Sequence, residues 1–339
     1  MNAFSLPQTV DLMLSPGKGL LAADESFPSI EKRFKPLGIA STEDNRRAYR
    51  EMLFTTPGLA DFISGVILFD ETLHQKAASG VAFADGLAMQ GIVPGIKVDL
   101  GAVALPGFPR EKFTQGLDGL RERLADYYQL GARFAKWRAV ISIDDGLPTK
   151  TCIGVNARML ALFAALSQEA GLVPVVEPEV LMEGAHPLSR CEEVITRTLQ
   201  TVFEELEAHR VVLEHMILKS GMVLPGDGCD QQASDADIAE ATVRCFRRSV
   251  PPAVPGIVFL SGGQSEQEAT QRLDAIASTR DLPWRITFSY GRALQDSALK
   301  AWHGSAANVS HGQDLLLHRA RCNSQAALGT YTASMEEQP

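Results

Sequence analysis

Residues 211–223 read VVLEHMILKSGMV, an apolar run rich in Val, Leu, Ile and Met that Ser220 and Gly221 close. Such a run predicts a buried β-strand. One lysine, Lys219, lies near its C-terminal end. Burying a cation is costly unless the charge is paired or used. Two interpretations are therefore open. The side chain reaches solvent, or its amine is a nucleophile that forms a Schiff base with a carbonyl substrate.

Apolar runs of similar length recur along the whole chain. They number eight and cover residues 19–23, 62–69, 91–98, 133–141, 172–176, 211–218, 256–260 and 284–288. Amphipathic segments that predict helices lie between most of them, at residues 41–53, 116–131, 156–171, 187–209, 234–249, 266–278 and 293–303. The connection at residues 73–80 is too short for a full helix.

This alternation predicts an α/β fold with a parallel sheet. Eight strand–helix units favour a closed (β/α)8 TIM barrel. A doubly wound open sheet is the alternative, and it is disfavoured because no GxGxxG follows the first run. The length of 339 residues suits a barrel that forms a single domain. We therefore expect one domain at residues 1–328, followed by a mobile polar tail at residues 329–339.

Composition limits the partners and the compartment. The net charge of −9 argues against a nucleic-acid partner. No apolar run reaches the roughly 18 residues of a membrane span, and the N-terminus lacks a targeting pattern. We recognise no CxxC motif and no Cys/His pair at metal-ligand spacing, so the five cysteines are expected to be free thiols. These features predict a cytoplasmic protein that binds neither membrane nor metal.

Polar residues cluster where the predicted strands end, which is where barrel enzymes place their chemistry. The sequence offers Asp24 and Glu25, Lys97 and Asp99, Lys136 and Arg138, Glu177 and Glu179, Lys219, residues 261–263, and residues 289–292. An acidic protein that gathers five cations at one rim suggests an anionic substrate. The loops SGGQS (261–265) and SYGRA (289–293) each lead into a predicted helix, and backbone N–H groups there can bind phosphate. Arg292 can donate two hydrogen bonds to phosphate oxygens.

Strand periodicity predicts which of these side chains meet. Lys136 and Arg138 alternate with Trp137, so both cations share one strand face. If that face is the barrel interior, Lys136 lies near Lys219. A lysine of pKa about 10.4 is almost wholly charged at pH 7, and a neighbouring cation together with burial would lower that pKa. Glu177 and Glu179 also share a face, and one of them could act as a general acid and base.

The chain resembles the class I, Schiff-base-forming fructose-bisphosphate aldolases. The matching stretches follow in order: GLLAADES (19–26), GVILFDETL (65–73), GIKVD (95–99), TQGLDGL (114–120), AKWR (135–138), VEPE (176–179), LKSGMV (218–223), VPGIVFLSGGQSE (254–266) and FSYGRALQ (288–295). The resemblance implies reversible cleavage of fructose 1,6-bisphosphate to dihydroxyacetone phosphate and glyceraldehyde 3-phosphate. It also implies no cofactor, a sugar phosphate as the small-molecule partner, and a homotetramer.

The resemblance further implies roles for the matching residues. Lys219 resembles the Schiff-base lysine, and Glu177 the acid and base that dehydrates the carbinolamine. Asp24 resembles the carboxylate that takes the C4 hydroxyl proton, and Lys136 the cation that tunes this cluster. The contacts implied for the C1 phosphate are Ser261, Gly262, Gly291 and Arg292. Those implied for the hydroxyls and the C6 phosphate are Ser29, Lys97 and Arg138, with Glu179 positioning nearby cations.

Three stretches depart from the family pattern. Ser220-Gly221 replaces the usual Pro-Asn after the nucleophile, and Phe27-Pro28 replaces the usual Thr-Gly. Many relatives end in a proton-shuttling tyrosine, whereas Tyr331 here is followed by eight more residues, so the group that handles the C3 proton is left open.

Two other function classes are considered. A metal-dependent aldolase or isomerase is disfavoured because the seven histidines form no HxH or HExxH motif, and His215 is interpreted as a core residue of the strand. A non-catalytic scaffold is suggested by the departures but disfavoured by the complete set of catalytic residue types.

Overall fold

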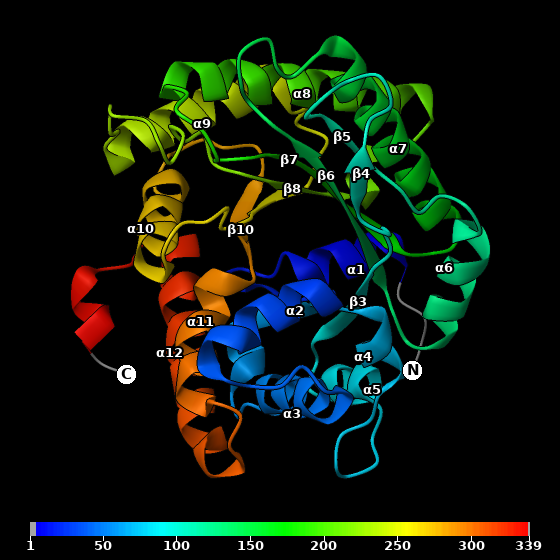
Figure 1. The fold of residues 1–339 in the computed structure, drawn as a ribbon, viewed down its shortest axis with the longest axis vertical. Helices are drawn as coiled ribbons and strands as arrows, with labels where there is room; N and C mark the ends of the chain where they lie inside the picture. The colour runs from blue at the N-terminus through cyan, green and yellow to red at the C-terminus, as the bar shows by residue number, and fades with distance from the viewer. Residues whose placement is uncertain (1–4, 338–339) are drawn as a thin grey trace.

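A closed barrel of parallel strands forms the centre of the protein (Figure 1). The computed structural model describes residues 5–337. The barrel strands are β1 (Gly19–Ala23), β2 (Ile63–Leu68), β3 (Val93–Lys97), β6 (Phe134–Ile141), β7 (Val173–Val180), β8 (Ile217–Ser220), β9 (Gly256–Phe259) and β10 (Arg285–Tyr290). Each strand pairs in parallel with its neighbour in the chain, and β10 pairs with β1 to close the ring. The predicted (β/α)8 barrel is therefore confirmed.

Helices surround the barrel on its outer side (Figure 1). They are α2 (Phe27–Phe34), α3 (Glu43–Phe54), α4 (Asp70–His74), α5 (Phe83–Met89), α6 (Leu120–Gln129), α7 (Lys150–Glu169), α8 (Leu188–Ala208), α9 (Asp235–Ser249), α10 (Glu266–Ala277), α11 (Arg292–Trp302) and α12 (Val309–Ala327). Several begin where the sequence predicts, because Thr42, Ser234 and Ser265 cap the first turns of α3, α9 and α10. The short connection near residue 73 contains the two small helices α4 and α5. Helix α12 was not predicted.

Strands β7 and β8 differ most from their predicted bounds. Strand β8 begins at Ile217, not at residue 211, because Leu213–His215 form a 3-10 helix. The Gln168 side chain satisfies the backbone of Val212, with its Oε1 and Nε2 3.0 and 2.8 Å from the Val212 nitrogen and oxygen. His215 therefore lies before the strand and not in it. Strand β7 continues through Glu177 and Glu179, which are both buried.

An N-terminal helix closes one end of the barrel. Helix α1 (Leu6–Met13) buries Val10 and Met13 against side chains that fill the barrel interior, including Leu20, Phe134 and Ile217. The Ser64 hydroxyl on β2 donates to the Met13 carbonyl at 2.6 Å. Because apolar side chains fill this end, the polar side chains of the interior lie toward the opposite, C-terminal ends of the strands.

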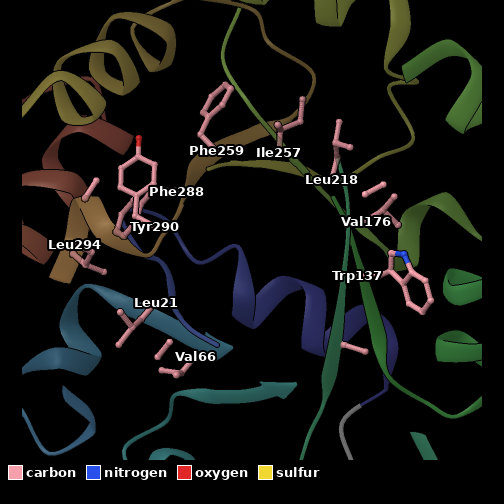
Figure 2. Packing of buried hydrophobic residues seen from close by; sticks show 14 of the residues in the cluster. Leu21, Val66, Trp137, Val176, Leu218, Ile257, Phe259, Phe288, Tyr290 and Leu294 are labelled. Atoms are coloured by element: carbon pink, nitrogen blue, oxygen red, sulfur yellow. The ribbon is translucent and has the colours of Figure 1, made fainter. Parts of the chain in front are cut away.

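A second apolar layer lies between the barrel and its helices. Figure 2 shows Trp137, Val176 and Leu218 on successive strands, directed toward the surrounding helices. The Trp137 ring lies 5.7 Å from that of Phe163 on α7. Successive strand residues point to opposite faces. The neighbours of these three residues, among them Lys136, Glu177 and Lys219, therefore point into the barrel.

Further segments complete the described chain. Strands β4 (Ala102–Ala104) and β5 (Lys112–Thr114) form an antiparallel hairpin outside the barrel. After α12, the chain ends in a 3-10 helix at Ala333–Glu337, beside α10 in Figure 1. The last two residues of the predicted tail lie outside the described residues. No helix between residues 5 and 337 has the length and hydrophobicity to cross a membrane.

Gly95 provides a test of the interior packing. A Cβ at this position would lie 2.2 Å from the Phe134 ring. We expect Gly95→Ala to lower the free energy of unfolding by about 1–3 kcal/mol, because the interior has no room for the added methyl group. Gly154→Ala is the matched control. Gly154 lies in α7 with no atom within 4 Å of its added methyl, so the change should stabilise by up to about 1 kcal/mol. Urea unfolding measures the change in the free energy of unfolding for both variants. Equal changes for Gly95→Ala and Gly154→Ala would contradict the close contact between Gly95 and the Phe134 ring.

Candidate active site

Four charged side chains form one connected cluster inside the barrel. Lys219 Nζ lies 3.1 Å from Glu177 Oε1, and Lys136 Nζ lies 3.0 Å from Glu177 Oε2. Lys136 also donates to Asp24 Oδ2 at 2.8 Å. Lys219, Lys136 and Glu177 are each at most 4% exposed. The structure thus brings together the four residues predicted to be catalytic, with Glu177 between the two lysines.

Strand register explains this meeting. Lys136 on β6 pairs with Val175 on β7, two residues before Glu177, and Val176 pairs with Leu218, one residue before Lys219. The three side chains therefore come from neighbouring strands at similar heights. Asp24 directly follows β1 and reaches them from across the barrel, since β1 is not adjacent to β6 in the ring.

The two carboxyl groups are ionised at neutral pH. Burial acts to raise the pKa of Asp24, but the charges of Lys136 and Lys219 outweigh burial and lower this pKa to about 2. The pKa of Glu177 is also lowered, because the same two lysines outweigh the effect of burial. Conversely, burial acts to lower the pKa of Lys136, while Asp24 and Glu177 raise it well above its usual value. Lys136 is therefore a fixed ammonium group beside two carboxylates.

A second polar group lies next to this cluster on β3, β6 and β7. Arg138 forms an ion pair with Glu179, and Lys97 Nζ lies 2.8 Å from Asp99 Oδ1. Asp99 Oδ2 also accepts from the Arg138 backbone nitrogen at 3.3 Å. Burial acts to lower the pKa of Arg138, but Glu179 raises it further above its usual range. Sequence reasoning gave no role to Asp99, although GIKVD pointed to it, and the structure shows that it positions Lys97 and the Arg138 backbone.

The predicted phosphate-binding loops lie on neighbouring strands, β9 and β10. Gly262 and Gly263 adopt positive φ angles of 56° and 96°, which favour glycine. A methyl group at Gly263 would lie 4.0 Å from Nη2 of Arg292, so the Arg292 guanidinium lies beside the loop that contains Ser261 and Gly262. The structure therefore brings the Arg292 side chain next to the first of the two loops.

The two helix N-termini behind these loops differ. In α10, the backbone nitrogens of Ser265 and Glu268 bond to each other's side chains at 2.9 and 3.2 Å. This capping box uses two of the N–H groups at the start of α10, so an anion at the SGGQS loop would be bound by other backbone N–H groups. Helix α11 begins at Arg292 after Gly291, with no capping side chain and no acidic residue in its first turn. The Leu294 N–H donates to the Gly291 carbonyl at 3.1 Å, and the uncapped N–H groups before it can donate to a bound anion.

Residues 25–29 lie apart from the lysine cluster. Ser29 is exposed on α2, and its hydroxyl lies 3.2 Å from that of Ser26; no contact in the described chain joins it to the lysine cluster. Glu25 pairs with Arg33 and, at 2.8 Å, with Arg50. Its carboxylate is therefore neutralised by structural arginines.

The departures at residues 27–28 and 220–221 have local explanations. The Phe27 ring lies edge-on to Phe69 at 5.2 Å, and the Arg46 guanidinium lies 4.7 Å from its centre. Ser220 is buried, and its hydroxyl donates to the Gly221 carbonyl at 3.1 Å. Both changes thus fit the surrounding packing, and Lys219 keeps its place beside Glu177.

Tyr331 lies on the outside of the barrel, against α10 and α12. Its backbone nitrogen donates to Asp274 Oδ1 at 2.9 Å, and its hydroxyl donates to Glu336 Oε1 at 2.8 Å. Burial and the bond to Glu336 raise the pKa of Tyr331. The tail at residues 331–336 is thus held by its own contacts.

Sequence reasoning also missed one pair of side chains. His318 and Cys322 are four residues apart, and α12 places them one turn apart on one face. The statement that no Cys/His pair has metal-ligand spacing is therefore wrong, because helix α12 itself was not recognised. The cysteines are free of disulfides, as predicted.

The cluster has the groups that amine catalysis needs. A buried lysine amine adjoins a carboxylate that can accept and return its proton. A fixed cation holds a second carboxylate near the same point. Arg292 and backbone N–H groups that can bind phosphate come from the loops that follow β9 and β10 in the same barrel.

Known proteins are similar to this chain over nearly its whole length. The family model for fructose-bisphosphate aldolase class-I matches residues 5–339. A probable fructose-bisphosphate aldolase class 1 of Xanthomonas campestris is 53% identical, covering 98% of this chain and 99% of that protein. The cytosolic fructose-bisphosphate aldolase 4 of Arabidopsis thaliana is 50% identical, covering 97% and 85%. A crystal structure of fructose-bisphosphate aldolase from Plasmodium falciparum, solved with TRAP and an inhibitor, has 48% identity, a TM-score of 0.95, and coverage of 97% and 95%.

The family model and these identities agree with the barrel and with the order of the matching stretches. The chain belongs to the class I fructose-bisphosphate aldolase family.

Proposed function

We propose that this protein cleaves fructose 1,6-bisphosphate reversibly to dihydroxyacetone phosphate and glyceraldehyde 3-phosphate through a Schiff base on Lys219. Family membership supports the reaction. The observation that carries the mechanism is the contact of Glu177 with both Lys219 and Lys136. A non-catalytic scaffold is disfavoured, because an unused cluster of three buried ionisable side chains and the half-buried Asp24 would be costly to keep.

The first half of the reaction joins Lys219 to the substrate ketone. Glu177 is a carboxylate 3.1 Å from the amine, so it is the base within reach of the proton that Lys219 must lose. The amine adds to the C2 carbonyl and gives a carbinolamine. Glu177 then returns the proton to the departing hydroxyl, so that water leaves and an iminium forms.

The second half breaks the C3–C4 bond. Asp24 is ionised and held by Lys136, so it can accept the C4 hydroxyl proton. The electron pair of the C3–C4 bond moves into the iminium, which becomes an enamine, and C4 leaves as the aldehyde. Protonation of the enamine at C3 and hydrolysis then release dihydroxyacetone phosphate and free Lys219.

Phosphate binding fixes the substrate across the barrel. Arg292, Gly291 and the open first turn of α11 would hold the C1 phosphate with Ser261 and Gly262. Lys97 and Arg138, on the other side of the cluster, would bind the hydroxyls and the C6 phosphate with Ser29, while Glu179 orients Arg138. These positions would place C2 beside Lys219 and the C4 hydroxyl beside Asp24.

The assembly and location of the protein are further parts of the proposal. The chain would act as a single barrel domain in a homotetramer, as the family resemblance implies. Relatives named as cytosolic or cytoplasmic aldolases support a cytoplasmic location.

Schiff-base trapping tests the nucleophile. Borohydride added with dihydroxyacetone phosphate should reduce the iminium and attach the triose irreversibly to Lys219, because the buried amine forms the bond. Mass spectrometry of the peptides locates the adduct. Lys219→Arg should abolish both adduct and turnover.

Lys18→Arg is the matched control for this test. Lys18 Nζ donates to the Ala60 carbonyl at 2.7 Å, outside the cluster, so its loss should leave labelling intact. An adduct on another lysine, or labelling that survives Lys219→Arg, would show the assigned nucleophile to be wrong.

The charge of Asp24 predicts a pH-independent contribution to catalysis. Its folded-state pKa of about 2 lies below the usual aspartate value of 3.8, so Asp24 is ionised throughout the range from pH 5 to pH 9. Asp24→Asn should lower kcat by roughly 10²–10⁴-fold, the usual range for a lost general base. The ratio of the two rates should stay constant across that range. A ratio that approaches one as the pH falls through 6 would show that Asp24 titrates there and is not held by Lys136.

A further inference from the structure

Three side chains with metal-ligand chemistry meet where the chain end packs on α12. His318 Nε2 lies 3.7 Å from Cys322 Sγ and 3.9 Å from Glu336 Oε2. All three ligand atoms lie within 4.8 Å of one another. Two of the residues come from one turn of α12 and the third from the C-terminal 3-10 helix. The group lies on the outer side of the barrel, apart from the lysine cluster.

These separations are close to those of a coordination shell. Zinc binds sulfur at about 2.3 Å, and imidazole nitrogen and carboxylate oxygen at about 2.0–2.2 Å. Tetrahedral angles then place the ligand atoms about 3.3–3.6 Å apart. The distances of 3.7 and 3.9 Å exceed that range by only a few tenths of an ångström. The third pair, Cys322 Sγ and the Glu336 carboxylate, lies within 4.8 Å, so closing the shell brings these two side chains closer together.

Burial and ligand type narrow the choice of cation. Cys322 is 1% exposed, and the side chains of His318 and Glu336 are 9% and 14% exposed. A thiolate, an imidazole and one carboxylate favour Zn²⁺ or Co²⁺ over Mg²⁺ or Ca²⁺, which prefer oxygen ligands alone. Tyr331 donates to Glu336 Oε1 at 2.8 Å, which is the kind of outer hydrogen bond typical of metal-bound carboxylates. Arg319 pairs with Oε2, the oxygen 3.9 Å from His318 Nε2, so a cation would share Oε2 with Arg319.

Arg319 limits how tightly a cation can bind. Its guanidinium pairs with Glu336, and it also bonds to the Glu266 carbonyl at 3.1 Å and to Thr270. The contacts with α10 keep Arg319 in place whether or not Glu336 is shared with a cation. Its positive charge opposes a second cation nearby, so the site should bind more weakly than a structural zinc site built from thiolates alone.

We propose that His318, Cys322 and Glu336 form a Zn²⁺ site that fastens the C-terminal segment to α12. The fourth position is open to water or to the Met335 carbonyl, which lies 4.0 Å from Cys322 Sγ. Zn²⁺ binding replaces the proton of the Cys322 thiol with a zinc–sulfur bond, and the proton leaves to solvent. The site is structural and takes no part in aldol cleavage.

Cobalt substitution in the full-length protein tests the site directly. Co²⁺ alone should bind at one equivalent per chain and give the near-ultraviolet absorption of a cobalt–thiolate bond, and Zn²⁺ should displace it. Cys322→Ser should abolish this absorption. His318→Gln and Glu336→Gln should each weaken Co²⁺ binding by at least about tenfold, since each removes one ligand. Cys229→Ser, which removes a more accessible thiol, should leave the absorption unchanged.

Proteolysis provides a second measurement that does not depend on the thiolate spectrum. Zn²⁺ should slow carboxypeptidase trimming of the wild-type chain end, and this protection should disappear in Glu336→Gln. Circular dichroism establishes that each variant is folded. Absorption that persists in Cys322→Ser, absorption lost in Cys229→Ser, or the lack of saturable binding to the wild type would each overturn the proposal. None of these results depends on turnover, so they are separate from the test of the aldolase reaction.

Discussion

Glu177 places its carboxylate between the buried amino groups of Lys219 and Lys136, and the catalytic end of the barrel is built around that contact. Lys219 and Lys136 approach its two oxygens at 3.1 and 3.0 Å, and Asp24 supplies the fourth charge. Lys136 is a charged ammonium group that contacts the carboxylates of both Asp24 and Glu177. Removing any one would leave an uncompensated buried charge, which is among the costliest defects a protein interior can contain. The same contacts keep both carboxylates ionised, as their chemistry requires.

The barrel makes this arrangement possible by separating two kinds of residue on each strand. Outward positions such as Trp137, Val176 and Leu218 pack against the helices, and the residues beside them point inward (Figure 2). Helix α1 and an apolar layer close the opposite end, and the charged side chains of the interior cluster lie near the C-terminal rim. The outward-facing residues of a strand thus pack against the helices, and the inward-facing residues of the same strand carry the reactive groups.

At the rim of the barrel, charge comes from particular side chains and helix ends and is not spread evenly over the loops. The capping box of α10 uses its own first turn, whereas α11 leaves its N–H groups open beside Arg292. Glu25 is neutralised by Arg33 and Arg50, and Asp99 holds Lys97. Charged residues that look alike along the sequence therefore divide into structural pairs and groups available to a substrate. Only their three-dimensional partners distinguish the two classes.

The sequence by itself determined the barrel, the family and the identity of the inward-facing charges. Strand periodicity and the position of polar residues at strand ends are local properties that a chain carries in its order of residues. Tertiary structure alone decided that Glu177 contacts both lysines, that residues 213–215 leave the strand, and that α12 brings His318 and Cys322 toward Glu336. These outcomes depend on register and on side chains distant in sequence, such as Gln168 bonding the backbone of Val212. Contacts of that kind have no local signal, because neither partner alone indicates the other.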